Sequence, residues 1–209
     1  MTFLMKWCQR NVGEYRYPLG GKLYVFNKNE NIGFIKGHMC SPAIATQAED
    51  LIAGGVKELI HVGYAGGLQP ELVPGGIILT DGAFNDTAVA RLYGYDYDII
   101  HSSKDLTNEI EEMITSAEIL YKRGIHWTTD AGYRETWGQV MDYRDKGALC
   151  VEMEGVGLFT IANYRKCVAT GIYVVSDVYL EDDWKLGWEG NDIKKAVGEI
   201  IDMIIKSIR

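Results

Sequence analysis

The chain alternates between two patterns of hydrophobic positions. Alternating or β-branched apolar runs predict strands at 22–27, 31–37, 56–62, 76–80, 125–129, 148–153 and 168–176. Apolar residues at helical spacing predict helices at 42–53, 105–122, 137–146, 155–164 and 191–207. Strands and helices alternate without a repeat, a linker or a break in composition. We therefore expect one α/β domain over residues 1–209, with a central mixed β-sheet flanked by helices.

Composition narrows the class of protein and of partner. The chain is 47% hydrophobic and 11% aromatic, which excludes a disordered or low-complexity chain. Its 21 basic and 29 acidic residues give a net charge of −8 without a basic stripe, so a nucleic acid is not an expected partner. No apolar segment is typical of a signal peptide or long enough for a membrane span. We therefore expect a cytoplasmic protein without membrane contact.

The cysteines are isolated from one another in the sequence, at Cys8, Cys40, Cys150 and Cys167. None of them belongs to a C-x-x-C pair or to a cysteine–histidine set with the spacing of metal ligands. Reduced thiols in a cytosolic protein are the simplest interpretation. We expect no metal ion and no organic cofactor.

Three predicted strand ends carry residues with chemical potential, since ligands of α/β sheets gather where strands end. These are the glycine cluster 63–67, the carboxylates Glu152 and Glu154, and the pair Ser176 and Asp177. Each also has a purely structural interpretation. Glycine clusters are commonly turns, and acidic residues commonly lie at helix starts or act as caps. The pattern alone therefore predicts an α/β protein with a small-molecule site.

Several segments together resemble the nucleoside phosphorylase/nucleosidase superfamily, which includes purine nucleoside phosphorylases, uridine phosphorylases and methylthioadenosine nucleosidases. They occur in the family's order and spacing and are GHMCSP (37–42), GVKELIHVGYAGGL (55–68), PGGIILT (74–80), TTDAGYRET (128–136), VEMEG (151–155) and VVSDV (174–178). The resemblance covers roughly residues 20–209. It implies cleavage of the bond between ribose C1′ and a nucleobase through a cationic sugar transition state.

The resemblance assigns roles to individual residues of this sequence. Asp177 matches the acid that protonates or hydrogen-bonds the purine N7, which requires a carboxyl group kept protonated near neutral pH. Glu154 matches the carboxylate that receives the ribose 2′- and 3′-hydroxyls. Met153 and Met39 match residues that pack on the sugar. This set predicts a purine-type substrate, and a pyrimidine is less expected.

A second set of residues is implied to contact the base. Ala65 and Gly66 match backbone that approaches the sugar and base closely, which accounts for their small size. Tyr133 falls in the base-stacking segment, and Glu152 is assigned to the base site as well.

The sequence departs from the family where phosphate should bind. His61 replaces an arginine, Tyr64 replaces a small hydroxyl residue after Gly63, and the family's first strand with its phosphate loop is expected to be missing. Phosphate as a co-substrate would depend on backbone N–H groups and on a protonated His61. Tyr64 either fills the volume that phosphate needs, places its phenol beside ribose C1′, or turns into the core. We expect weak phosphate dependence, with water as the alternative acceptor.

The resemblance also implies a homo-oligomer, a dimer or a hexamer, because a neighbouring subunit completes the 5′ end of the sugar site in relatives. The leading hypothesis is an enzyme that cleaves purine nucleosides by phosphorolysis or hydrolysis. The alternative is a non-catalytic member of the same superfamily that binds a nucleoside.

Overall fold

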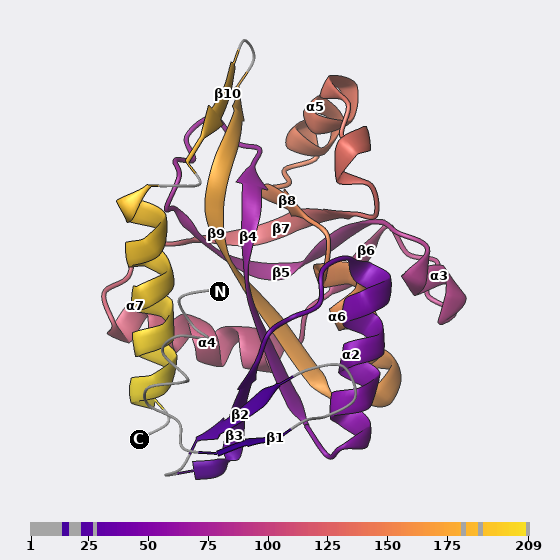
Figure 1. Ribbon diagram of the computed structural model, residues 1–209. Helices are drawn as coiled ribbons and strands as arrows, with labels where there is room; N and C mark the ends of the chain where they lie inside the picture. The colour runs from indigo at the N-terminus through magenta and orange to yellow at the C-terminus, as the bar shows by residue number, and fades with distance from the viewer. Residues whose placement is uncertain (1–13, 17–21, 27–28, 181–182, 188–189, 208–209) are drawn as a thin grey trace.

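The computed structural model describes residues 14–16, 22–26, 29–180, 183–187 and 190–207 (Figure 1). Cys8 lies outside these ranges. The strands are β1 (Glu14–Arg16), β2 (Leu23–Phe26), β3 (Asn29–Ile35), β4 (Glu58–Gly67), β5 (Ile77–Asp86), β6 (Ile99–His101), β7 (Lys122–Thr129), β8 (Cys150–Glu152), β9 (Val168–Leu180) and β10 (Asp183–Leu186). The helices are α2 (Ser41–Ala53), α3 (Val89–Leu92), α4 (Lys104–Ser116), the 3₁₀ turn η1 (Gly132–Arg134), α5 (Trp137–Asp145), α6 (Gly155–Arg165) and α7 (Asn191–Ser207).

The main sheet has seven strands in the order β10-β9-β4-β8-β7-β5-β6. The β4–β9, β5–β7 and β7–β8 pairs are parallel and the others are antiparallel, so the expected mixed sheet is confirmed. An additional antiparallel pairing of β9 with β5 joins strands β9-β4-β8-β7-β5 into a ring. The strands β1-β2-β3 form a separate small antiparallel sheet.

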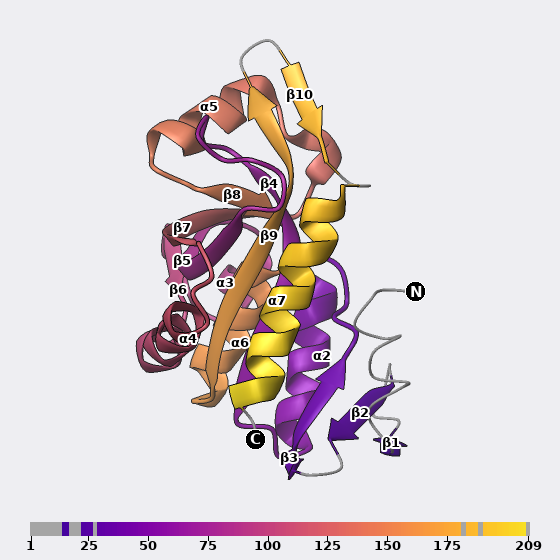
Figure 2. The same ribbon diagram turned by 90° about the vertical axis from the view of Figure 1, so that its left-hand side faces the viewer.

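Helices cover both faces of the sheet. In Figures 1 and 2, α4 and α7 lie on one side of β9 while α2 and α6 pack together on the other. The α4–α7 side has a core that includes Ile110, Ile114 and Ile200, all at most 1% exposed. The α2–α6 side has its own core around Phe159 and Ile161. This layered packing is the flanked α/β arrangement that the sequence predicts.

Helix α4 is shorter than its hydrophobic pattern predicts. It ends at Ser116, and Glu118 has a positive φ of 54°, a backbone conformation that ends an α-helix. Leu120, which the pattern placed on the buried helix face, is 91% exposed. Strand β7 begins at Lys122, the last residue that helical spacing had assigned to the helix, where the chain pairs with β5.

The glycine cluster 63–67 is part of strand β4 and not a turn. A Cβ atom at Gly66 would lie 2.9 Å from the Tyr179 ring and 3.4 Å from Asp177 Oδ2. The glycine is needed for close packing, and strand pairing continues through it to Gly67. Three short strands, β1, β6 and β10, were not predicted, because three or four residues are too few for a period to be recognised.

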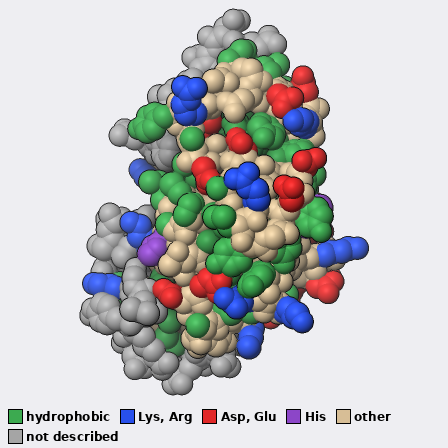
Figure 3. Space-filling view, turned by 90° about the vertical axis from the view of Figure 1, so that its right-hand side faces the viewer, with side chains coloured by type: hydrophobic (Ala, Val, Ile, Leu, Met, Phe, Trp, Pro, Cys, Tyr) green, Lys and Arg blue, Asp and Glu red, His purple; other side chains and the backbone are tan. Residues whose placement is uncertain are grey.

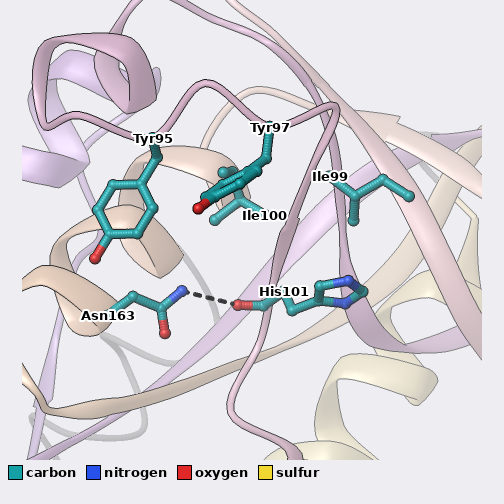
Figure 4. A pocket seen from close by; sticks show the side chains of 6 residues that line it. All are labelled: Tyr95, Tyr97, Ile99, Ile100, His101 and Asn163. Atoms are coloured by element: carbon teal, nitrogen blue, oxygen red, sulfur yellow. Dashed lines mark hydrogen bonds between the residues drawn. The ribbon is translucent and has the colours of Figure 1, made fainter.

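The surface outside the predicted site residues has mixed chemistry. Figure 3 shows hydrophobic side chains interspersed with acidic and basic ones on the face of α2, α3, α5 and α6. A shallow pocket of about 360 Å³ beside β6 is lined by Tyr95, Tyr97, Ile99, Ile100, His101 and Asn163 (Figure 4). It contains none of the predicted site residues. Among the helices of the described ranges, none is long and apolar enough to cross a membrane.

Candidate active site

Gly66 marks the point where three strands meet. It pairs with Val151 of β8 on one side and with Asp177 of β9 on the other. The register of β4 and β9 shifts between Ala65 and Gly66, which is a bulge beside Asp177. The topology therefore brings together all three strand ends that the sequence singles out: the glycine cluster lies between the β8 strand that leads to Glu152 and the β9 strand at Asp177.

Asp177 is buried, with 5% of its surface exposed. The Ser176 hydroxyl lies 2.6 Å from Asp177 Oδ1 and 3.2 Å from the Ala65 carbonyl oxygen. One hydroxyl has one proton for these two acceptors. The Ser176 hydroxyl therefore links the Asp177 carboxyl to the β4 backbone at Ala65.

Two residues that the sequence analysis did not assign lie beside Asp177. The Tyr179 hydroxyl donates to Glu135 Oε2 at 2.8 Å. Burial and, to a smaller extent, the charge of Asp177 raise the pKa of Glu135, against the hydrogen bond from Tyr179. Tyr179 follows Asp177 by two positions on a strand and so shares its face, which is the signal that could have identified it. Glu135 lies within the TTDAGYRET segment.

The predicted sugar residues lie where the loop before α2 contacts the start of α6. The Cys40 backbone N–H donates to Glu154 Oε1 at 2.7 Å, and the Ser41 hydroxyl donates to the Met153 carbonyl at 3.1 Å. Pro42 at the first turn of α2 suits that helix start. A Cβ at Gly157 would come within 2.5 Å of the Ser41 carbonyl oxygen, so the two helices approach as closely as backbone permits.

Glu154 is a partly buried carboxylate with a second carboxylate nearby. Burial, followed by the charge of Glu152, raises the pKa of Glu154 to about 7, although the Cys40 N–H favours its ionised form. Near neutral pH the Glu154 side chain is therefore partly ionised and partly protonated. The ionised form can accept two hydroxyl protons, and the protonated form accepts fewer.

Glu152 precedes Glu154 by two positions, and its side chain is only 1% exposed. Its Oε2 accepts the backbone N–H groups of Glu154 and Gly155, each at 2.8 Å. Its Oε1 accepts from the Thr128 hydroxyl at 2.5 Å and faces His126 Nε2 at 3.0 Å. These contacts face inward and tie β8, β7 and the first turn of α6 together, so the predicted contact of Glu152 with a base has no support in them.

The predicted phosphate residues lie upstream on β4. His61 is partly buried, with Nδ1 3.5 Å from the Tyr173 hydroxyl, and burial lowers its pKa. A neutral imidazole therefore stands where the sequence analysis required a protonated one. Tyr64 is 43% exposed, so the interpretation that it packs in the core is wrong.

Met39 and Tyr133 are predicted contacts that the structure leaves at the surface. Met39 is 74% exposed, and Tyr133, in η1, is fully exposed. The neighbouring Gly132 does approach Met153, since a Cβ there would lie 3.5 Å from Met153 Sδ. Residues 132–135 thus contact the predicted site through Gly132 and Glu135, while the Tyr133 side chain remains at the surface. In the described ranges, no cluster of three or more His, Cys, Asp or Glu side chains is arranged to hold a metal ion.

Fold and site together define a member of a known class. The family model described as the Phosphorylase superfamily matches residues 6–206, and the chain belongs to that family. The resemblance predicted from the sequence is thereby confirmed. A solved purine nucleoside phosphorylase from Toxoplasma gondii, in complex with immucillin-H, superposes with a TM-score of 0.82. It shares 18% identity and covers 96% of this chain and 84% of its own.

The curated relatives are more similar in sequence. A DeoD-type purine nucleoside phosphorylase of Exiguobacterium sibiricum is 32% identical over 139 residues, 65% of this chain and 59% of the relative. The enzyme of the same name from Caldanaerobacter subterraneus is 33% identical over 156 residues, covering 69% of this chain and 67% of the relative. The chain thus matches about three fifths of the length of the first of these relatives.

Proposed function

We propose that this protein cleaves the N-glycosidic bond of purine nucleosides. Asp177 acts as the acid toward the purine ring, and Glu154 receives the ribose 2′- and 3′-hydroxyls. The observation that carries the proposal is the meeting of β4, β8 and β9 at Gly66, which places the buried Asp177 carboxyl across Gly66 from Val151, on the strand that leads to Glu154. The purine nucleoside phosphorylase names of the relatives support the purine class.

Two opposite charges develop during bond cleavage, and the site must stabilise both. The sugar becomes cationic as the bond to the base lengthens, and a carboxylate at Glu154 lies where the hydroxyls of that sugar would bind. The departing base becomes anionic, and a proton or hydrogen bond from Asp177 neutralises it. General-acid contributions of this kind are typically on the order of 10²–10⁴ in rate.

Phosphate is the proposed co-substrate, used weakly. The relatives are named phosphorylases, which supports phosphorolysis. The neutral His61, whose pKa burial lowers, gives the acceptor end of the site no permanent positive charge. Water is the competing acceptor, which would release free ribose in place of ribose 1-phosphate.

The test is a nucleoside screen with and without phosphate. Purine and pyrimidine ribonucleosides are incubated with the protein, and free base and sugar product are separated by chromatography. We expect base release from purines, with a phosphate requirement only in the millimolar range. Binding of a purine nucleoside by calorimetry without any base release would instead favour the non-catalytic alternative.

We further propose a cytoplasmic homo-oligomer. Large hydrophobic side chains near the site, including Met39, Tyr133 and Trp137, are exposed in the single chain, as expected where a second copy covers them. Analytical ultracentrifugation at micromolar concentration should show a species of at least twice 23.4 kDa. A monomer alone would contradict the proposal.

A further inference from the structure

His126 is a fully buried histidine whose two ring nitrogens both have hydrogen-bonding partners. The Thr80 hydroxyl lies 2.8 Å from the Gly82 carbonyl oxygen and 2.6 Å from His126 Nδ1. On the other side, Nε2 lies 3.0 Å from Glu152 Oε1. An ionised carboxylate only accepts hydrogen bonds. Nε2 therefore carries a proton, which it donates to the Glu152 carboxylate.

Glu152 in turn is ionised, because every one of its neighbours donates to it. It accepts from the Thr128 hydroxyl and from the backbone N–H groups of Glu154 and Gly155. Burial opposes the charge on Glu152, but the electrostatic interaction with His126 and the hydrogen bonds from His126 and Thr128 outweigh it and lower the pKa of Glu152. The N-terminus of α6 adds a favourable dipole for an anion at this position.

The pair has a consequence for the adjacent carboxylate. Glu152 holds the backbone N–H of Glu154 itself, so the direction in which the Glu154 side chain leaves the chain depends on where Glu152 is anchored. The hydrogen bond from the Cys40 N–H to Glu154 Oε1, 2.7 Å long, then restricts the rotation of that side chain. A buried charge left without its partner is strongly unfavourable, so loss of His126 would displace or neutralise Glu152.

We propose that His126 is a positioning residue for the sugar site: it anchors the Glu152 carboxylate beneath the first turn of α6, and Glu152 thereby aims Glu154 at the ribose hydroxyls. This inference rests on the proposed function. It assigns Glu152 to positioning as well, in place of contact with the base. Neither side chain touches the nucleoside, because both are at most 1% exposed.

The experiment compares two substrates that differ only in the groups that Glu154 would bind. The ratio of kcat/KM for a purine ribonucleoside to that for its 2′,3′-dideoxy analogue is measured in wild type, His126→Gln and His126→Phe. We expect the ratio to fall about tenfold or more in His126→Phe, while kcat/KM for the dideoxy analogue changes little. His126→Gln keeps a donor toward Glu152 and should recover part of the ratio. These changes follow because a misdirected Glu154 affects only substrates with the two hydroxyls.

A structural role alone would predict a different result. If His126 served only stability, both substrates would lose activity in proportion to the fraction folded and the ratio would stay at its wild-type value, which would overturn the inference. His101→Gln is the matched control, an exposed histidine on β6, and should leave the ratio unchanged. If His126→Phe does not fold, the Gln variant alone decides, with a smaller expected drop.

The proposed function can fail separately. If wild-type protein releases base from no purine nucleoside, the catalytic proposal is wrong. The same ratio is then taken from dissociation constants of the two nucleosides by calorimetry. A ratio of binding constants that falls in His126→Gln supports the positioning role without catalysis, and an unchanged ratio contradicts it.

Discussion

The two ends of strand β4 differ in what holds them. At Gly66 and Gly67 the strand pairs with β8 on one side and β9 on the other, and Ala65 beside them is 3% exposed. From Glu58 to Ala65 its described pairing is with β9 alone, and Ile60 and Tyr64 are 38% and 43% exposed. One strand thus carries a tightly enclosed region, which the proposed function assigns to base and sugar, and a more open region, which it assigns to the acceptor.

Under the proposed function, the enclosed end holds the carboxyl groups that act on the base and the sugar. The open end carries a neutral imidazole and an exposed phenol, neither of which offers a permanent charge to an anion. We therefore expect substitutions at the enclosed end to change the rate of bond cleavage and those at the open end to change only what accepts the sugar.

The largest effect is expected from Asp177→Asn at the enclosed end. The amide cannot deliver a proton to the purine, so kcat should fall about 10²–10⁴-fold while the nucleoside dissociation constant stays within a few fold. Steady-state kinetics and calorimetry measure the two quantities. Asp142→Asn, a surface acid on α5, is the control and should behave as wild type. Near wild-type turnover in Asp177→Asn would remove this residue from its role.

The open end is tested by supplying what it lacks. Tyr64→Ser with His61→Arg adds a small hydroxyl and a permanent charge, and each charge-assisted hydrogen bond is worth roughly 1.5–3 kcal/mol. The KM for phosphate should therefore fall by about two powers of ten or more, without a matching change in KM for the nucleoside.

The control for that double variant is a similar pair placed elsewhere. Tyr97→Ser with His101→Arg changes the same residue types in the surface pocket beside β6. It should leave the KM for phosphate unchanged. A wild-type KM for phosphate already in the sub-millimolar range would instead show that the open end is a competent phosphate site.

How much of this could be predicted from the sequence follows the same division. Asp177 and Glu154 lie at predicted strand ends, which made them candidates, and the resemblance to the superfamily supplied their expected roles. The contact between Glu152 and His126 joins residues 26 positions apart, and the hydrophobic pattern of neither segment predicts it. Glu135 and Tyr179 likewise meet across 44 positions. The strand through Gly63–Gly67 was mistaken for a turn, because a glycine needed for close packing and one needed for a turn look alike in sequence.

A smaller effect, on stability, is expected from Glu154→Gln. The folded protein keeps a proton on Glu154 up to about pH 7, whereas the ordinary pKa of the side chain is 4.5. Between these values the folded state binds more protons than the unfolded state, so this group's contribution to stability falls as pH rises. Glutamine has no such dependence. The variant should be more stable by about 1–3 kcal/mol at pH 8, with the difference closing near pH 4.

Urea unfolding at the two pH values measures this, together with nucleoside binding. The same variant should bind ribonucleosides more weakly, because an amide accepts fewer hydroxyl protons than a carboxylate. Equal stability of variant and wild type at pH 8 would contradict the raised pKa of Glu154.

The smallest effect is expected at Cys40, the residue immediately before α2, which has φ 72° and ψ 149°. Non-glycine residues rarely adopt this conformation, and such strain is typically on the order of 1–3 kcal/mol. Cys40→Gly relieves it and keeps the backbone N–H that donates to Glu154, but adds freedom to the unfolded chain. We expect a net gain of about 1 kcal/mol in the free energy of unfolding, with the KM for nucleoside unchanged. Cys40→Ala separates the two causes, since it removes the thiol and keeps the strain. A gain in Cys40→Ala equal to that in Cys40→Gly would show that the thiol, not the backbone, is unfavourable there.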